Sequence, residues 1–216
     1  MEEKKTMCVI IYKDKKTSLD FETIRLAYDT NPDGVGVAIN DGITWTIKKY
    51  MYPSRQQLKT LCNNLKDKEA ILHFRIATSG GINLDNCQPF LFDDDQRVLF
   101  HNGVIYSLNG ISSYKSDTRL LIDILEKEKQ DINNILFNIA EKSSNKFILL
   151  DEKNEIQFYG DFKQYKGLLC SNLNFVPRPP MPATQKKEKE PVFKNYADFF
   201  ESRRTHWEDD LLYNNY

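Results

Sequence analysis

Three short segments combine small, polar and charged residues in a way that a plain hydrophobic core would not. They are HFRIATSGG at residues 73–81, HNG at 101–103 and SDT at 116–118. Arg75 lies between apolar residues of an expected buried strand, where an unpaired guanidinium would be costly. We therefore expect Arg75 to contact a carboxylate, which belongs either to the protein itself or to a ligand.

The other two segments each allow a structural and a chemical interpretation. Asn102 and Gly103 can form a tight turn, the commonest use of this dipeptide. They can equally present a side-chain amide and an unhindered backbone N–H to an oxyanion. Asp117 fits the N-cap or the first turn of a helix, a position that alone would account for a carboxylate. The residue types leave both interpretations open.

The elements that must position these residues follow from hydrophobic periodicity. Polar turns, among them the one at residues 40–42, join neighbouring strands into hairpins. This order favours an α+β fold with antiparallel sheets over a doubly wound parallel sheet. The pattern predicts strands at 8–12, 34–39, 44–48, 70–76, 98–101, 146–151 and 155–159, and helices at 18–29, 54–65, 117–128 and 131–140.

Charge and hydropathy exclude several classes of function. Thirty basic and 31 acidic residues give a formal charge of −1, so no global field favours nucleic acid or an anionic membrane. The apolar runs are far shorter than the roughly 20 residues that cross a bilayer, and no signal-type segment is present. Four scattered cysteines and three histidines indicate no metal site. We expect a cytoplasmic protein without metal or cofactor, which binds neither nucleic acid nor membrane.

The composition changes near residue 177, where a Pro-, Lys- and Glu-rich stretch begins. It holds five of the eight prolines and a cluster of charges, which is typical of a linker. The last residues carry aromatic side chains at helical spacing and an acidic end, and this helix would dock either on its own domain or on a separate partner. The expected divisions are an extension or propeptide at 1–7, a globular domain at 8–176, a linker at 177–191 and a helix at 192–216.

Six motifs follow one another along the chain. They are MC at 7–8, TNPDG at 30–34, HFRIATSGG at 73–81, NCQPF at 86–90, HNG at 101–103 and SDT at 116–118. Their order resembles the glutaminase domain of the class II glutamine amidotransferases, a family of N-terminal nucleophile hydrolases. The resemblance covers about residues 7–160, and the chain is most similar to the small stand-alone members of bacteria and bacteriophages. It implies an Ntn-hydrolase-like four-layer αββα sandwich with two antiparallel sheets.

The resemblance assigns a role to seven residues. It implies that Cys8 is the nucleophile, which forms a thioester, and that the α-amine of Cys8 is its base. An α-amine titrates near 7.7–8.0, close enough to neutral pH to take the thiol proton. Asn102 and Gly103 would bind the oxyanion, and Arg75 and Asp117 would hold the α-carboxylate and α-ammonium of glutamine. Thr78 and Ser79 would line the pocket.

Some positions depart from the family pattern. MEEKKTM precedes Cys8, so the α-amine becomes available only by one of two routes. Either autocatalysis or a protease removes the prefix, or translation begins at Met7 and this methionine is then removed. Thr30 replaces a common arginine, Ser79 stands where some members have histidine, and Gln88 replaces a frequent histidine. Gln88 can hydrogen-bond but cannot titrate.

Three functions are compatible with this pattern. The first is a glutaminase that supplies ammonia to a partner acceptor synthase, with the C-terminal helix as the candidate contact. The second is a hydrolase of γ-glutamyl compounds, which would use the same charged groups. The third is a catalytically inactive binding or regulatory protein that retains MEEKKT and interacts through its C-terminal helix. The state of the mature amino terminus distinguishes the enzymes from the binding protein.

Overall fold

The structure of the chain is a computed structural model, which describes residues 7–94, 96–127 and 131–177. Most of the expected extension, the linker beyond residue 177 and the expected C-terminal helix lie outside the described residues. No helix of the described part is long and apolar enough to cross a membrane.

The larger sheet has six strands in the order β3-β2-β4-β1-β10-β9, and all of its neighbouring pairs are antiparallel. β1 and β4 are central, and their pairing runs from Val9 opposite Phe74 to Lys13 opposite Ala70. β1 and β4 therefore lie side by side along the whole length of β1. The strands are β1 (Val9–Lys13), β2 (Gly34–Asn40), β3 (Trp45–Tyr50), β4 (Glu69–Arg75), β9 (Lys163–Tyr165) and β10 (Leu168–Cys170).

The smaller sheet has four antiparallel strands in the order β5-β6-β7-β8. Because side chains alternate along a strand, Val98 and Phe100 of β6 face the larger sheet, whereas Leu99 and His101 face the opposite way. The strands are β5 (Phe90–Phe92), β6 (Arg97–Asn102), β7 (Lys146–Leu150) and β8 (Ile156–Tyr159).

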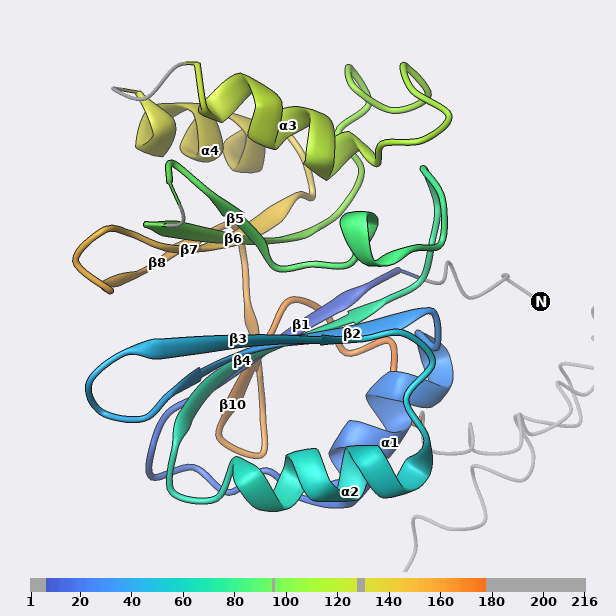
Figure 1. The fold of residues 1–216 in the computed structure, drawn as a ribbon, viewed down its shortest axis with the longest axis vertical. Helices are drawn as coiled ribbons and strands as arrows, with labels where there is room; N and C mark the ends of the chain where they lie inside the picture. The colour runs from blue at the N-terminus through green and yellow to red at the C-terminus, as the bar shows by residue number, and fades with distance from the viewer. Residues whose placement is uncertain (1–6, 95, 128–130, 178–216) are drawn as a thin grey trace, which may run out of the picture. The chain divides into compact units, whose positions relative to one another are not determined.

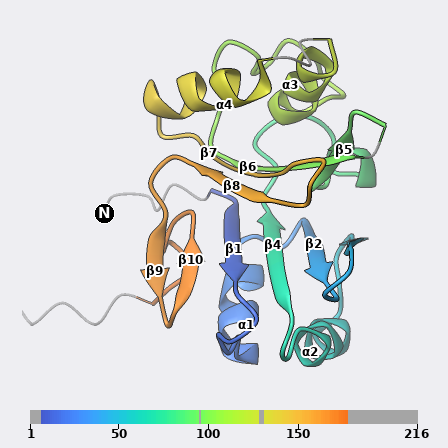
Figure 2. The ribbon, with the colours of Figure 1, turned by 90° about the vertical axis from the view of Figure 1, so that its left-hand side faces the viewer.

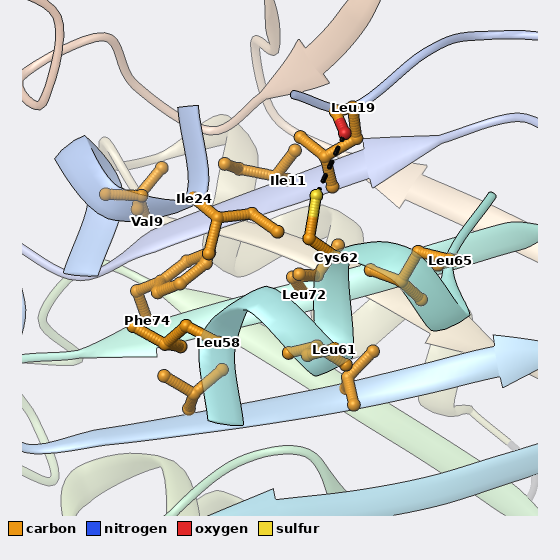
Figure 3. Packing of buried hydrophobic residues seen from close by; sticks show 14 of the residues in the cluster. Val9, Ile11, Leu19, Ile24, Leu58, Leu61, Cys62, Leu65, Leu72 and Phe74 are labelled. Atoms are coloured by element: carbon orange, nitrogen blue, oxygen red, sulfur yellow. Dashed lines mark hydrogen bonds between the residues drawn. The ribbon is translucent and has the colours of Figure 1, made fainter. Parts of the chain in front are cut away.

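Four helices complete a four-layer arrangement (Figure 1). One hydrophobic cluster joins α1 (Phe21–Thr30) and α2 (Arg55–Asn64) to the outer face of the larger sheet, and Figure 3 shows part of it. A second joins α3 (Asp117–Leu125) and α4 (Ile132–Glu141) to the smaller sheet. A third fills the space between the two sheets. The layer order confirms the predicted αββα sandwich.

The helix starts follow from capping residues in the sequence. Asp20 accepts the Thr23 N–H at the start of α1, and Ser54 forms a capping box with Gln57 at the start of α2. Ser116 caps α3 by accepting the Arg119 N–H at 3.2 Å. These side chains satisfy backbone N–H groups that a helix start leaves unpaired.

Four short elements lie where the sequence pattern predicted none. They are β5, β9, β10 and a 3-10 helix at Leu84–Asn86, and each has three residues. Three residues are too few to show a hydrophobic period. The β9–β10 hairpin matters for the site, because it places Ser171 beside β1, where its backbone N–H donates to Ile10 O at 2.9 Å.

Candidate active site

The pairing of β1 with β4 brings Cys8 and Arg75 to one end of the larger sheet, and Figure 2 shows these strands side by side. Val9 pairs with Phe74, so Cys8 and Arg75 flank this last pair. The Cys8 thiol donates to Ile76 O at 3.3 Å, and the Ile76 N–H points at Cys8 Sγ from 3.4 Å. The thiol is thereby fixed against the residue that follows β4.

A cavity of about 30 Å³ lies at this end of the sandwich. It is far smaller than the ~300–1,000 Å³ of common ligand pockets. Two larger hollows, of about 390 and 580 Å³, lie along α4, and neither is lined by a cysteine or a histidine. The small cavity therefore gathers the reactive side chains. Six of the seven predicted site residues line it: Cys8, Arg75, Thr78, Ser79, Gly103 and Asp117.

Arg75 is buried, and among the described residues it has no carboxylate partner. Its side chain is 4% exposed in relative terms, and Nη2 donates to the carbonyl oxygens of Gly81 at 3.1 Å and Ser79 at 3.5 Å. Nη1 has no hydrogen-bond partner, and no carboxylate forms an ion pair with Arg75 within the described ranges. Of the two partners expected from the sequence, a carboxylate of the protein and a carboxylate of a ligand, this arrangement favours the ligand.

Asp117 occupies the first turn of α3, directly after the N-cap residue Ser116. Its carboxylate accepts the Ile105 N–H at 2.8 Å and the Thr118 N–H at 2.7 Å. The start of α3 therefore accounts for the position of Asp117, as the structural interpretation of the sequence predicted. Because the same carboxylate lines the cavity, the chemical interpretation is compatible with the first.

Asn102 is the one predicted site residue that does not line the cavity. Its side-chain amide donates to Ser171 Oγ at 2.8 Å, and Ser171 Oγ also accepts the Ile10 N–H at 2.8 Å. Asn102 Oδ1 is buried and has no partner within the described residues. The Asn102 amide thus links the end of β6 to the larger sheet. The next residue, Gly103, lines the cavity.

Gly103 needs to be glycine for two reasons. Its φ of +146° is one that other L-residues rarely adopt, and a Cβ at this position would lie 2.0 Å from Asn145 Oδ1. No side chain fits between the Gly103 backbone and Asn145, so the backbone N–H of Gly103 is not shielded by a side chain of its own.

Burial raises the pKa of the Cys8 thiol to about 11, although the Ile76 backbone and the Arg75 guanidinium oppose this shift. The thiolate is the nucleophilic form of cysteine. At neutral pH the thiol is therefore protonated and needs a base close by. Met7 precedes Cys8, and while that peptide bond is intact the nitrogen of Cys8 is an amide that cannot serve as this base.

Several polar residues that the sequence interpretation left without a role hold the site together. Gln88 lies two residues before β5 begins, and its Oε1 accepts the His101 N–H at 2.5 Å. Asn86 Nδ2 donates to Gly81 O at 3.1 Å and Tyr114 O at 2.7 Å, and so ties the two loops at the mouth of the cavity. Both residues lie in the NCQPF motif at 86–90, and this motif is the sequence feature that could have indicated their role.

Asp33 and Asn145 are two further supports. Asp33 accepts the Ala77 N–H at 2.8 Å, and its own backbone N–H donates to Arg75 O at 3.0 Å. Asp33 lies in the TNPDG motif, whereas Asn145 lies in no motif. Its contact with His101 joins residues 44 positions apart, which no local pattern reveals.

The αββα sandwich is the fold expected of the N-terminal nucleophile hydrolases, and a comparison of sequences gives the family. The model of the family "Glutamine amidotransferases class-II" matches residues 7–119, which is more than half of the 216 residues. The chain belongs to the class II glutamine amidotransferases. The match spans β1 to the start of α3 and therefore contains all seven predicted site residues. A comparison with curated proteins finds no match.

Proposed function

We propose that this protein is a glutaminase, which cleaves the side-chain amide of glutamine through a thioester at Cys8 and supplies the ammonia to an acceptor enzyme. The observation that carries the proposal is the cavity itself. It gathers a thiol, a carboxylate and a buried guanidinium that has no carboxylate partner in the part of the chain that the structure describes. The thiol matches the scissile amide of glutamine, the guanidinium matches its α-carboxylate, and the carboxylate matches its α-ammonium.

Substrate recognition would rest on two opposite charges. Arg75 would bind the α-carboxylate, which relieves the cost of a buried guanidinium with an unpaired Nη1. Asp117 would bind the α-ammonium through lone pairs that remain beside its two backbone contacts. Thr78 and Ser79 would line the channel between them. Peptide-bound glutamine lacks both charges and would be excluded.

The reaction would proceed in two steps. Cys8 Sγ attacks the amide carbon of glutamine, and the resulting oxyanion accepts a hydrogen bond from the Gly103 N–H. Asn102 does not line the cavity, so its amide would have to turn its second N–H toward the oxyanion to add another hydrogen bond. The α-amine of Cys8 takes the thiol proton and returns it to the leaving ammonia, so that a γ-glutamyl thioester remains. Water then adds to the thioester, with the amine again as base, and glutamate is released with the thiol restored.

The base in this scheme requires the mature chain to begin at Cys8. Burial raises the pKa of the thiol to about 11, whereas an α-amine titrates near 7.7–8.0. Removal of residues 1–7 would therefore create the base next to a thiol that is otherwise inert at neutral pH. The prefix makes the chain a proenzyme in this account.

Two features extend the proposal beyond the reacting atoms. The loops at 76–86 and 103–116 border the cavity through Thr78, Ser79 and Gly103 and would form the entrance for glutamine. The ammonia would pass to a separate synthase in the cytoplasm. The aromatic spacing within residues 192–216 makes that segment our candidate for the contact with this partner.

Covalent trapping tests the reaction directly. A chain that begins at Cys8 is mixed with glutamine, quenched in acid after short intervals and analysed by intact mass. We expect a γ-glutamyl adduct on Cys8 and release of ammonia, and Cys8→Ala should show neither. Cys62→Ala is the matched control, because Cys62 is a buried thiol whose contact is Leu19 O in the α1–α2 layer. An active Cys8→Ala protein would refute the mechanism.

A further inference from the structure

Asn145 is a buried polar residue that follows α4 and directly precedes β7. Its side chain is 4% exposed in relative terms, and it packs flat against Gly103, where an added Cβ would meet Asn145 Oδ1, Cγ and Cα. It lies outside the segment that matches the family model. Nothing in its own neighbourhood along the sequence requires a buried amide at this position.

The contacts of the Asn145 amide fix its orientation. Nδ2 donates to Val104 O at 3.1 Å and to Ser143 Oγ at 2.8 Å. A carbonyl oxygen can only accept, so the nitrogen must face Val104. Oδ1 therefore faces His101 Nε2, which lies 2.8 Å away.

This orientation determines the tautomer of His101. Since Asn145 Oδ1 can only accept, His101 Nε2 carries the ring proton and Nδ1 is left as an acceptor. The Thr118 hydroxyl, 2.7 Å from Nδ1, then donates to the ring. Its one proton is used there, so it is not donated to Asp117 Oδ1, 3.3 Å away. That carboxylate oxygen then accepts the Thr118 backbone N–H and not the Thr118 hydroxyl.

The hydrogen bonds form a closed ring around the turn that follows β6. The ring runs from Asn145 through His101 to Thr118 and Asp117, and the Asp117 carboxylate accepts the Ile105 N–H. The peptide bond from Ile105 to Val104 leads back to Asn145. Phe147 stacks on the His101 ring with the centroids 4.6 Å apart. The ring thereby links the position of Asp117 to that of the turn after β6.

We propose that Asn145 is a positioning residue, which acts through His101 and Val104 to hold the Gly103 N–H and the Asp117 carboxylate in place for catalysis. The proposal rests on the proposed glutaminase function. It adds a residue from outside the family motifs, and it assigns one support to two separate tasks: oxyanion stabilisation at Gly103 and ammonium binding at Asp117.

The test compares Asn145→Ala with Asn138→Ala in the full chain after maturation. Asn138 is an exposed residue of α4 whose amide also donates to a backbone carbonyl, that of Asn134. We expect Asn145→Ala to lower kcat for ammonia release about 10- to 100-fold and to raise KM, because small displacements of reacting groups have effects of this size. Asn138→Ala should match the wild type. An Asn145→Ala protein within twofold of wild type in both constants would overturn the proposal.

A second measurement separates this proposal from the function on which it rests. Nitrogen NMR of labelled histidine should show His101 with a proton on Nε2 alone in the wild type and a mixture of tautomers in Asn145→Ala, whether or not the protein is active. Asn145→Asp keeps the side-chain volume if the alanine variant does not fold, and its carboxylate should favour protonation of both His101 nitrogens. An unchanged His101 spectrum in both variants would overturn the ring. An inactive wild type with the expected spectra would refute the glutaminase function alone.

Discussion

At the scale of single residues, the unusual feature is a buried arginine whose Nη1 has no partner within the described residues. Two carbonyl oxygens contact the other nitrogen, and they do not neutralise its charge. Charge-assisted bidentate binding of a carboxylate is the contact that a guanidinium makes best. Arg75 can therefore still bind a carboxylate, because no described residue of the protein occupies its Nη1.

Arg75→Lys tests this interpretation, because lysine keeps the charge and loses the planar pair of donors. We expect KM for glutamine to rise about 10- to 100-fold, the range that corresponds to losing one hydrogen bond to a charged group, with a smaller change in kcat. Steady-state ammonia release measures both constants. The control is Arg97→Lys, since Arg97 pairs with Glu152 at 2.9 Å and lies outside the small cavity. Equal KM values for the two variants would contradict the assignment.

At the scale of elements, much of the arrangement follows from the sequence. The helix expected at 54–65 is observed at Arg55–Asn64, because apolar spacing and a capping box agree. The six site residues that line the cavity were predicted from motifs. Ser171 and Asn145 were not, since their partners Asn102 and His101 are 69 and 44 positions away. The three-residue strands could not be predicted, because their pairing with neighbouring strands, and not a hydrophobic period, makes them strands.

Gly36 of β2 shows how one element depends on the shape of another. A Cβ at Gly36 would lie 1.6 Å from Gln88 O, so the loop that carries Gln88 rests directly on the β2 backbone. Gly36→Ala should destabilise the fold by about 3 kcal/mol through this overlap. Gly42→Ala is the control, because a Cβ added at Gly42 would have no atom within 4 Å. Its expected cost of about 1 kcal/mol comes from the strained φ of +98° alone. Urea unfolding with equal losses for both variants would contradict the close packing.

At the scale of the whole molecule, the space between the sheets contains a histidine that its surroundings keep neutral. Burial lowers the pKa of His73 to about 3, with Arg75 and His101 adding to the shift, and neither ring nitrogen has a partner within the described residues. Burial also lowers the pKa of His101. The unfolded chain binds these protons below about pH 6.5, whereas native His73 does not until about pH 3.

Stability should therefore fall as the pH drops from 6.5 towards 3, by up to about 1.4 kcal/mol per pH unit for His73. His73→Met replaces the ring with an apolar side chain and should flatten this dependence, because its unfolded state no longer takes up that proton. Urea unfolding at pH 7 and pH 5 gives the comparison. A variant that loses as much stability as the wild type over this interval would show that His73 does not contribute to the acid response.

The central claim is that Cys8 becomes the first residue of an active glutaminase. The measurement that tests it most directly is intact mass and amino-terminal sequencing of protein expressed from its own start region, followed by an ammonia-release assay with glutamine on the same sample. The account predicts a chain that begins at Cys8 and releases ammonia. A chain that retains MEEKKTM and releases ammonia at the same rate as one that begins at Cys8 would contradict it, because the proposed base would then be absent.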